Sequence, residues 1–253
     1  ADRISTPFGA PDIVVHAAAL KQNPAGEANP DEFIKTNVDG TRNLVQAANE
    51  MAVSKVLALS TDKAVYPSSA YGASKLCAEK LLMAAQEKSK NTLFSVLRLG
   101  NLLGSRGSIV PALLENINKK EISITHPDMT RFSLSLPESV EASLVVLSAM
   151  RGGEIFVPKM AAYRLKDLVR ALLPKAFMKV EGPRAADKMH ELALSTEEAR
   201  HSFVFQHFYV ICPLSESYLH WSDECEKLPQ DFVYSSEDPE LLLSPEKLSH
   251  LVK

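Results

Sequence analysis

The stretch that decides the fold is VLALSTDKAV at residues 56–65, followed by YGASK at residues 71–75. A short apolar run that ends in polar residues is typical of a buried strand whose end carries a site. The next segment, from near Tyr71 to Lys88, has the composition of a helix. On a helix, Tyr71 and Lys75 are i and i+4 neighbours and lie on one face.

Similar short runs recur along the chain, at Ile13–Val15, Val56–Leu59, Phe94–Leu97 and Ile155–Val157. They alternate with longer segments of helical period, which predicts an α/β fold with a doubly wound parallel sheet. We expect the first three runs to be buried strands. Asn29-Pro30 is a signal for a helix start. The apolar residues of that helix are Phe33, Val38, Leu44, Val45 and Ala48.

After Arg98 the expected elements become shorter and are separated by Gly and Pro. They are Pro111–Asn118, Phe132–Leu136, Glu138–Met150 and Leu165–Leu173. This change predicts a sheet domain over residues 1–100 and a smaller mixed α/β lobe over residues 101–253, with some elements returning to the sheet. The stretch from Ser215 onward has little periodicity, so we expect an irregular tail that wraps the lobe or a neighbouring subunit.

A doubly wound nucleotide-binding sheet normally begins with a strand, a glycine-rich turn and a helix whose N-terminus receives a pyrophosphate. No G-x-G-x-x-G occurs in the sequence. Ile13–Val15 already resembles a middle strand of such a sheet. We therefore expect roughly the first two βαβ units to be absent, through truncation of the chain or of its source sequence.

Composition excludes several classes of protein. The net charge of -3 offers no basic surplus for nucleic acid. Three widely spaced cysteines argue against a disulfide framework and fit a reducing cytoplasm. The first residues form no apolar h-region and no apolar run is long enough to span a membrane, so we expect a chain that is neither secreted nor membrane-spanning. The seven histidines show no metal-binding spacing, so we expect no metal.

The segment at residues 60–75 carries the chemistry. A cation near Tyr71, such as Lys75, favours phenolate and lowers the tyrosine pKa, which makes a base for oxidising an alcohol. By itself Tyr-x-x-x-Lys is a weak signal, since any surface helix can carry it. Asp62 and Lys63 add an acid and a base, which are the groups needed to eliminate water.

A strand ending in Ser60-Thr61, then Tyr71 and Lys75 on the next helix, resembles the short-chain dehydrogenase/reductase superfamily. Residues 59–65 are similar to the signature of UDP-N-acetylglucosamine 4,6-dehydratases. Further segments similar to that family are residues 16–21, 35–41, 100–101, 104–111, 129–132, 153–159 and 232–236. Tyr71, where retaining relatives often carry methionine, favours the configuration-inverting group of the pseudaminic acid pathway of bacterial surface glycans.

The resemblance implies a Rossmann-like fold, NADP as cofactor and a UDP-sugar as substrate. It also implies catalytic roles. Tyr71, assisted by Lys75 and Thr61, would take the proton of the sugar 4-hydroxyl. Lys63 would take the carbon 5 proton, for which its pKa must be lowered, and Asp62 would protonate the departing 6-hydroxyl.

Binding residues follow from the same resemblance. Those expected at the cofactor are Ala17, Ala18, Ala19, Asn37, Ser60, Tyr71, Lys75 and Gly100. Those expected at the substrate are Lys21, Asn101, Ser108, Arg131 and Arg184. The two arginines are expected at the diphosphate, because arginine binds phosphate in a bidentate manner. Two departures weaken the match: Pro183–Lys188 replaces a family Arg-Pro-Gly-Glu-Lys loop, and Leu99 replaces a common tyrosine.

Three alternatives stay open: a retaining dehydratase, an NAD-dependent sugar-nucleotide epimerase, and a non-catalytic remnant that binds a partner or UDP. The resemblance further implies a cytoplasmic homo-oligomer when the protein is full length. Without the glycine-rich unit, residues 1–253 alone are expected to be inactive. No nucleic-acid or membrane partner is expected.

Overall fold

The computed structural model describes residues 9–213 and 217–252, and its centre is a seven-stranded sheet. The strand order is β1 (Ile13–His16), β2 (Lys55–Thr61), β3 (Leu93–Leu99), β7 (Ile155–Pro158), β12 (Phe208–Ile211), β11 (Ser202–Phe205) and β13 (Glu226–Lys227). The first four strands are parallel and the last three are antiparallel to their neighbours. The predicted α/β class and its parallel sheet are confirmed.

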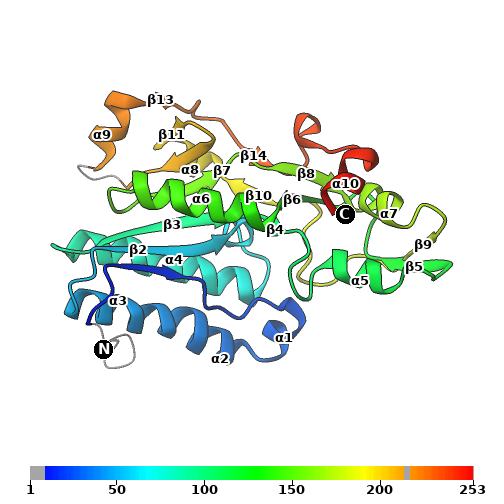
Figure 1. The fold of residues 1–253 in the computed structure, drawn as a ribbon, viewed down its shortest axis with the longest axis horizontal. Coiled ribbons are helices and arrows are strands. Elements are labelled where there is room, and N and C mark those ends of the chain that lie inside the picture. The colour runs from blue at the N-terminus through cyan, green and yellow to red at the C-terminus, as the bar shows by residue number, and fades with distance from the viewer. Residues whose placement is uncertain (1–8, 214–216, 253) are drawn as a thin grey trace.

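Helices cover both faces of the parallel part of the sheet (Figure 1). Helix α3 (Gly40–Glu50) and helix α4 (Ala70–Lys88) lie on one face, and helix α6 (Leu136–Ala149) lies on the other. Strands β2 and β3 are therefore apolar on both faces, as parallel strands usually are. Val56, Leu57, Phe94 and Val96 have no exposed surface.

A smaller lobe lies beside the carboxyl ends of the parallel strands (Figure 1). It contains α5 (Ile109–Glu115), β5 (Glu121–Ile124), β9 (Phe177–Val180), α7 (Leu165–Leu172) and α10 (Pro245–Val252). These elements share a second apolar core, which includes Ile122, Leu168 and Leu248. The lobe is joined to the main sheet through two small sheets. One pairs β4 (Asn101–Leu102), β6 (Thr130–Leu134) and β8 (Ala161–Arg164), and the other pairs β10 (Leu192–Leu194) with β14 (Tyr234–Ser235).

One helix predicted from the sequence is divided into shorter helices in the structure. The helix expected after Asn29-Pro30 is divided into α2 (Pro30–Phe33), a π-helix (Ile34–Asp39) and α3, and the Asn29 side chain caps none of it. The remaining helices are α1 (Asn23–Ala28), α8 (Thr196–Ala199), α9 (Ser217–Glu224) and two 3₁₀ turns, Asp62–Ala64 and Pro239–Leu241.

Two expectations are wrong. β1 is not a buried strand: Ile13 is 50% exposed and Val15 is 46% exposed, because in the described residues β1 pairs only with β2. The second concerns the segment that was expected to be an irregular tail. Ser215 lies outside the described residues, but residues 217–252 form α9, β13, β14 and α10. Its apolar residues pack against parts of the chain that are distant in sequence: Trp221 lies in the main core and Leu248 in the core of the lobe. These residues therefore do not follow the local spacing by which a helix or strand is predicted.

Within the described ranges, no helix combines the length and the apolar character needed to cross a membrane.

Candidate active site

The site begins where β2 ends at Thr61 and the chain makes a 3₁₀ turn over Asp62–Ala64. Helix α4 starts at Ala70, a short loop after this turn, with the Ser69 side chain accepting a hydrogen bond from Gly72 N–H. A Cβ on Gly72 would lie 2.3 Å from the carbonyl oxygen of Lys63, so only glycine lets the helix approach the turn this closely. This approach brings Tyr71 close enough to Thr61 for the threonine side chain to lower the tyrosine pKa.

Four of the predicted residues form one polar cluster. Asp62 has no exposed surface, and its Oδ1 accepts hydrogen bonds from Thr61 Oγ1 at 3.0 Å and from Lys63 Nζ at 2.9 Å. Lys63 Nζ also donates to Asn101 Oδ1 at 2.8 Å. Asp62 Oδ2 is buried and has no hydrogen-bond partner among the described residues.

The electrostatics of Tyr71 differ from the prediction. Burial raises the tyrosine pKa, and the groups that oppose this are the charge of Lys63 and the hydrogen bond with Thr61. Lys75, the expected cation, instead donates from Nζ to the carbonyl oxygen of Leu59 at 2.8 Å. Sequence spacing placed Lys75 on the correct helix face but could not show that the end of β2 offers it an acceptor.

The pKa of Lys63 is not lowered, as a role as base would require. Burial alone would lower the pKa of Lys63, but the carboxylates of Asp62 and Glu191 raise it well above its usual value. The charge of Arg131 opposes them and lowers the pKa. The raised pKa favours the ammonium form of Lys63, which must give up a proton before it can accept one.

Sequence reasoning missed Glu191, which lies just before β10 and is 3% exposed. Its carboxylate lies 3.6 Å from Lys63, 3.8 Å from Arg131 and 3.7 Å from Lys188. These charges meet at a cavity of ≈ 140 Å³. Its lining residues are Lys63, Ser68, Ser69, Arg131, Ala186, Asp187, Lys188 and Glu191. The only sequence signal for Glu191 was its place in a His-Glu pair resembling the family.

Several expected cofactor residues lie at the carboxyl ends of β1 and β2, where open parallel sheets bind ligands. Ala17, Ala18 and Ala19 are exposed there. Asn37 is buried and bonds both ways to the backbone of Leu20, with distances of 2.8 and 2.9 Å. It therefore holds the loop that carries the three alanines.

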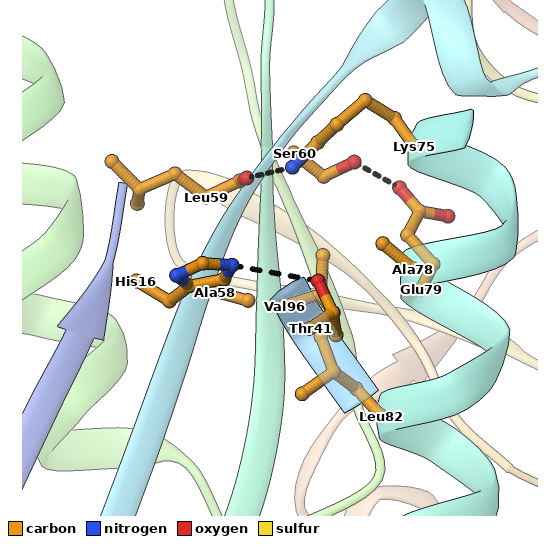
Figure 2. Close-up of a pocket in the computed structure, with 10 residues that line it drawn as sticks. All are labelled: His16, Thr41, Ala58, Leu59, Ser60, Lys75, Ala78, Glu79, Leu82 and Val96. Atoms are coloured by element: carbon orange, nitrogen blue, oxygen red, sulfur yellow. Dashed lines mark hydrogen bonds between the residues drawn. The ribbon is translucent and has the colours of Figure 1, made fainter. Parts of the chain in front are cut away.

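Two other expected cofactor residues have packing roles in the structure. A Cβ on Gly100 would lie 2.6 Å from Phe132 Cβ, so close packing alone requires glycine there. Ser60 donates to Glu79 at 2.6 Å and faces the interior. Figure 2 shows this bond, with that of Lys75 to Leu59 and that of Thr41 to His16, around a void too narrow for a water molecule.

The remaining substrate candidates are dispersed. Arg131 lines the cavity, although its Nη1 is bound to the carbonyl oxygens of Thr130 and Met189. Arg184 is exposed and is not among the lining residues. Lys21 is exposed and donates to Ser105 at 3.3 Å. Ser108 Oγ, at the start of α5, is buried and has no hydrogen-bond partner in the part of the chain that the structure describes.

A nicotinamide cofactor fits these residues at its reactive end. Lys75 is buried, and its ammonium group has three N–H donors. One of these donors forms the hydrogen bond to the carbonyl oxygen of Leu59. The exposed alanines, Ala17, Ala18 and Ala19, follow the end of β1. No group of three or more His, Cys, Asp or Glu that could hold a metal ion occurs in the described part of the chain.

Comparison with known proteins agrees with this geometry. Residues 1–213 match the polysaccharide biosynthesis protein family. A UDP-N-acetylglucosamine 4,6-dehydratase (inverting) of Campylobacter jejuni is 39% identical over 99% of this chain and 79% of that protein. A UDP-glucose 4-epimerase of Rickettsia rickettsii is 42% identical over 79% of this chain and 61% of that protein.

Solved structures show the same fold. Pen from Bacillus thuringiensis superposes with a TM-score of 0.87 at 30% identity, covering 99% of this chain and 78% of that one. The dTDP-glucose 4,6-dehydratase DesIV from Streptomyces venezuelae, solved with NAD bound, gives a TM-score of 0.64 at 22% identity, covering 70% and 63%. The fold and the site thus define an α/β protein of the Rossmann type with the short-chain dehydrogenase arrangement. The chain belongs to the polysaccharide biosynthesis protein family.

Proposed function

We propose that the protein is an NADP-dependent UDP-N-acetylglucosamine 4,6-dehydratase that inverts carbon 5. The observation that carries this proposal is the buried contact of Asp62 with Lys63 beside Tyr71. An epimerase needs the tyrosine but neither an acid nor a base for eliminating water. The identity to the Campylobacter jejuni dehydratase supports the same choice.

A bound nicotinamide cofactor would supply a hydride acceptor for carbon 4 and later a hydride donor for carbon 6. Tyr71, held by Thr61, takes the proton of the 4-hydroxyl. Asp62 protonates the leaving 6-hydroxyl and Lys63 takes the carbon 5 proton. Because Lys63 donates to Asp62 at 2.9 Å, transfer of this one proton produces both the neutral amine and the carboxylic acid that elimination needs.

Binding of the UDP moiety is proposed at the cavity, with Arg131 and Asn101 as contacts. Arg184, Lys21 and Ser108 stay candidates for the nucleotide. We also propose that the enzyme works in the cytoplasm as a homo-oligomer, in the pathway that makes pseudaminic acid. The product would be UDP-2-acetamido-2,6-dideoxy-β-L-arabino-hexos-4-ulose.

The test is the reaction of the full-length protein with UDP-N-acetylglucosamine and NADP in deuterium oxide, followed by NMR. We expect a 4-keto-6-deoxy product with deuterium at carbon 5 and inverted configuration. An unlabelled carbon 5 would contradict the elimination. A change at carbon 4 alone would favour the epimerase, which the identity to the Rickettsia rickettsii protein keeps as the second candidate.

Variants separate the two halves of the chemistry. Tyr71→Phe should stop oxidation at carbon 4, so no reduced cofactor forms. Lys63→Met should allow oxidation but slow elimination by about 100-fold or more. Lys166→Met, which breaks an ion pair with Asp128 away from the cavity, is the matched control and should leave both rates unchanged. Normal dehydration by Lys63→Met would show that this lysine moves no proton.

A further inference from the structure

Glu191 is a buried carboxylate for which the proposed chemistry has no use. Its backbone is fixed from both sides, since its N–H donates to Ser236 Oγ and its carbonyl oxygen accepts from Ser236 N–H, each at 2.9 Å. Only 3% of the residue is exposed. A buried charge is costly unless it is paired, so the pairing shows what the carboxylate serves.

Three cations share this carboxylate. Lys63 Nζ lies 3.6 Å and Arg131 Nε lies 3.8 Å from Oε1, and Lys188 Nζ lies 3.7 Å from Oε2. Oε2 accepts no hydrogen bond within the described chain. The Lys188 ammonium also donates to the carbonyl oxygen of Val65 at 2.6 Å, so it is held at the edge of the catalytic turn. Glu191 therefore acts on its neighbours through charge more than through hydrogen bonding.

Lys63 has further neighbours that affect its charge. Asp62 lies at 2.9 Å and Asn101, a neutral acceptor, lies at 2.8 Å. The charge of Lys63 also acts on Tyr71 and Tyr163, and it lowers the pKa of both against the opposing effect of burial.

The cations Arg131 and Lys188 oppose protonation of Lys63. Without Glu191, Asp62 would be the one carboxylate set against the three cations Lys63, Arg131 and Lys188, and Glu191 supplies a second negative charge.

We propose that Glu191 is a positioning residue that holds the Lys63 side chain against Asn101 in its ammonium form, and so keeps the proton of the Asp62–Lys63 pair in place until substrate enters. This inference rests on the proposed function only for the part that Lys63 plays in turnover. Burial and charge of the carboxylate carry the rest. Arg131 and Lys188 are shared between Glu191 and any anionic ligand, so a bound diphosphate would compete with Glu191 for them.

The direct test is an NMR titration of the full-length protein labelled with ¹³C at the lysine ε carbons, without substrate, with the Lys63 signal assigned by its loss in Lys63→Met. In the wild type this signal should stay in the ammonium form through the alkaline range in which the protein remains folded. In Glu191→Gln, the pKa of Lys63 should fall by ~1 unit or more, since an opposite charge within about 4–6 Å is removed. The falling limb of the pH–rate profile for elimination should move to lower pH in the same variant, because the Asp62–Lys63 pair loses the proton that it shares at a lower pH.

Two variants keep the test decisive. Glu237→Gln makes the same chemical change near the same strands, but Glu237 faces His190 at 3.6 Å, so the Lys63 titration should not move. Glu191→Asp keeps the charge and should titrate close to the wild type. An unshifted Lys63 in folded Glu191→Gln, or an equal shift in Glu191→Asp, would overturn the inference. The titration needs no turnover, so a failure of the proposed dehydration would leave it readable.

Discussion

Replacing Arg98 by methionine is the sharpest test of how the core supports the site. Arg98 lies in β3 and is 1% exposed. Its guanidinium bonds Glu79 at 2.7 and 3.2 Å, Glu198 at 2.9 and 3.0 Å, and the carbonyl oxygen of Ala193 at 2.9 Å. Glu79 in turn accepts a hydrogen bond from Ser60, one residue before Thr61. The network therefore links the core to the end of β2.

The expected loss is large because Arg98→Met leaves Glu79 buried without its cation. The Glu79 side chain is 1% exposed, whereas Glu198 at 21% can still reach water. Breaking a buried pair by removing one partner costs about 3–5 kcal/mol. For a chain of this size that lowers Tm by about 10 °C. In the double variant Arg98→Met with Glu79→Gln, much of this loss should be recovered, because the second change removes the unpaired charge.

Urea denaturation and calorimetry measure both quantities. Lys166→Met is the control: its ion pair with Asp128 is solvent-accessible, with side chains 31% and 54% exposed, and its loss should not change the free energy of unfolding measurably. If Arg98→Met costs less than about 1 kcal/mol, the buried network does not stabilise the fold and the reasoning is refuted.

Three further predictions concern the ends of the strands. Burial lowers the pKa of His16 to about 4 from 6.5, so the unfolded chain binds an extra proton between these values. The free energy of unfolding should therefore fall by up to about 3 kcal/mol as pH drops through that window, and His16→Gln should flatten the dependence in a urea-denaturation series. Gly100→Ala should cost about 1–3 kcal/mol on the same assay, because its Cβ would lie 2.6 Å from Phe132. Asn37→Ala removes both bonds to Leu20 and should speed proteolysis of the loop over residues 17–22, which mass spectrometry can follow.

Much of the fold could be predicted because its signals are local. The apolar runs at residues 56–59, 94–97 and 155–157 became β2, β3 and β7, and the helix expected at residues 71–88 became α4. Parallel strands buried on both faces consist of short apolar runs, and these are visible without knowledge of their neighbours. The prediction that β1 is buried was wrong because the burial of a strand depends on which strands pair with it, and the local sequence does not show this.

The polar cluster was partly predictable for the same reason. Thr61, Asp62 and Lys63 are consecutive, and Tyr71 starts the helix that follows. Asn101 follows the next strand of the sheet, so parallel order brings it to the same edge. A single βαβ unit therefore accounts for these contacts.

The sequence by itself determined the α/β class, the strand β2 with its polar end, and the residue types available for acid–base chemistry. Tertiary structure alone decided the charge state of those residues. Glu191 lies next to Lys63 although more than a hundred residues separate them in the sequence. Lys75 donates a hydrogen bond to the carbonyl oxygen of Leu59, where the sequence predicted an interaction with Tyr71. Charge depends on distance and burial, and both are fixed only when separate segments pack against one another.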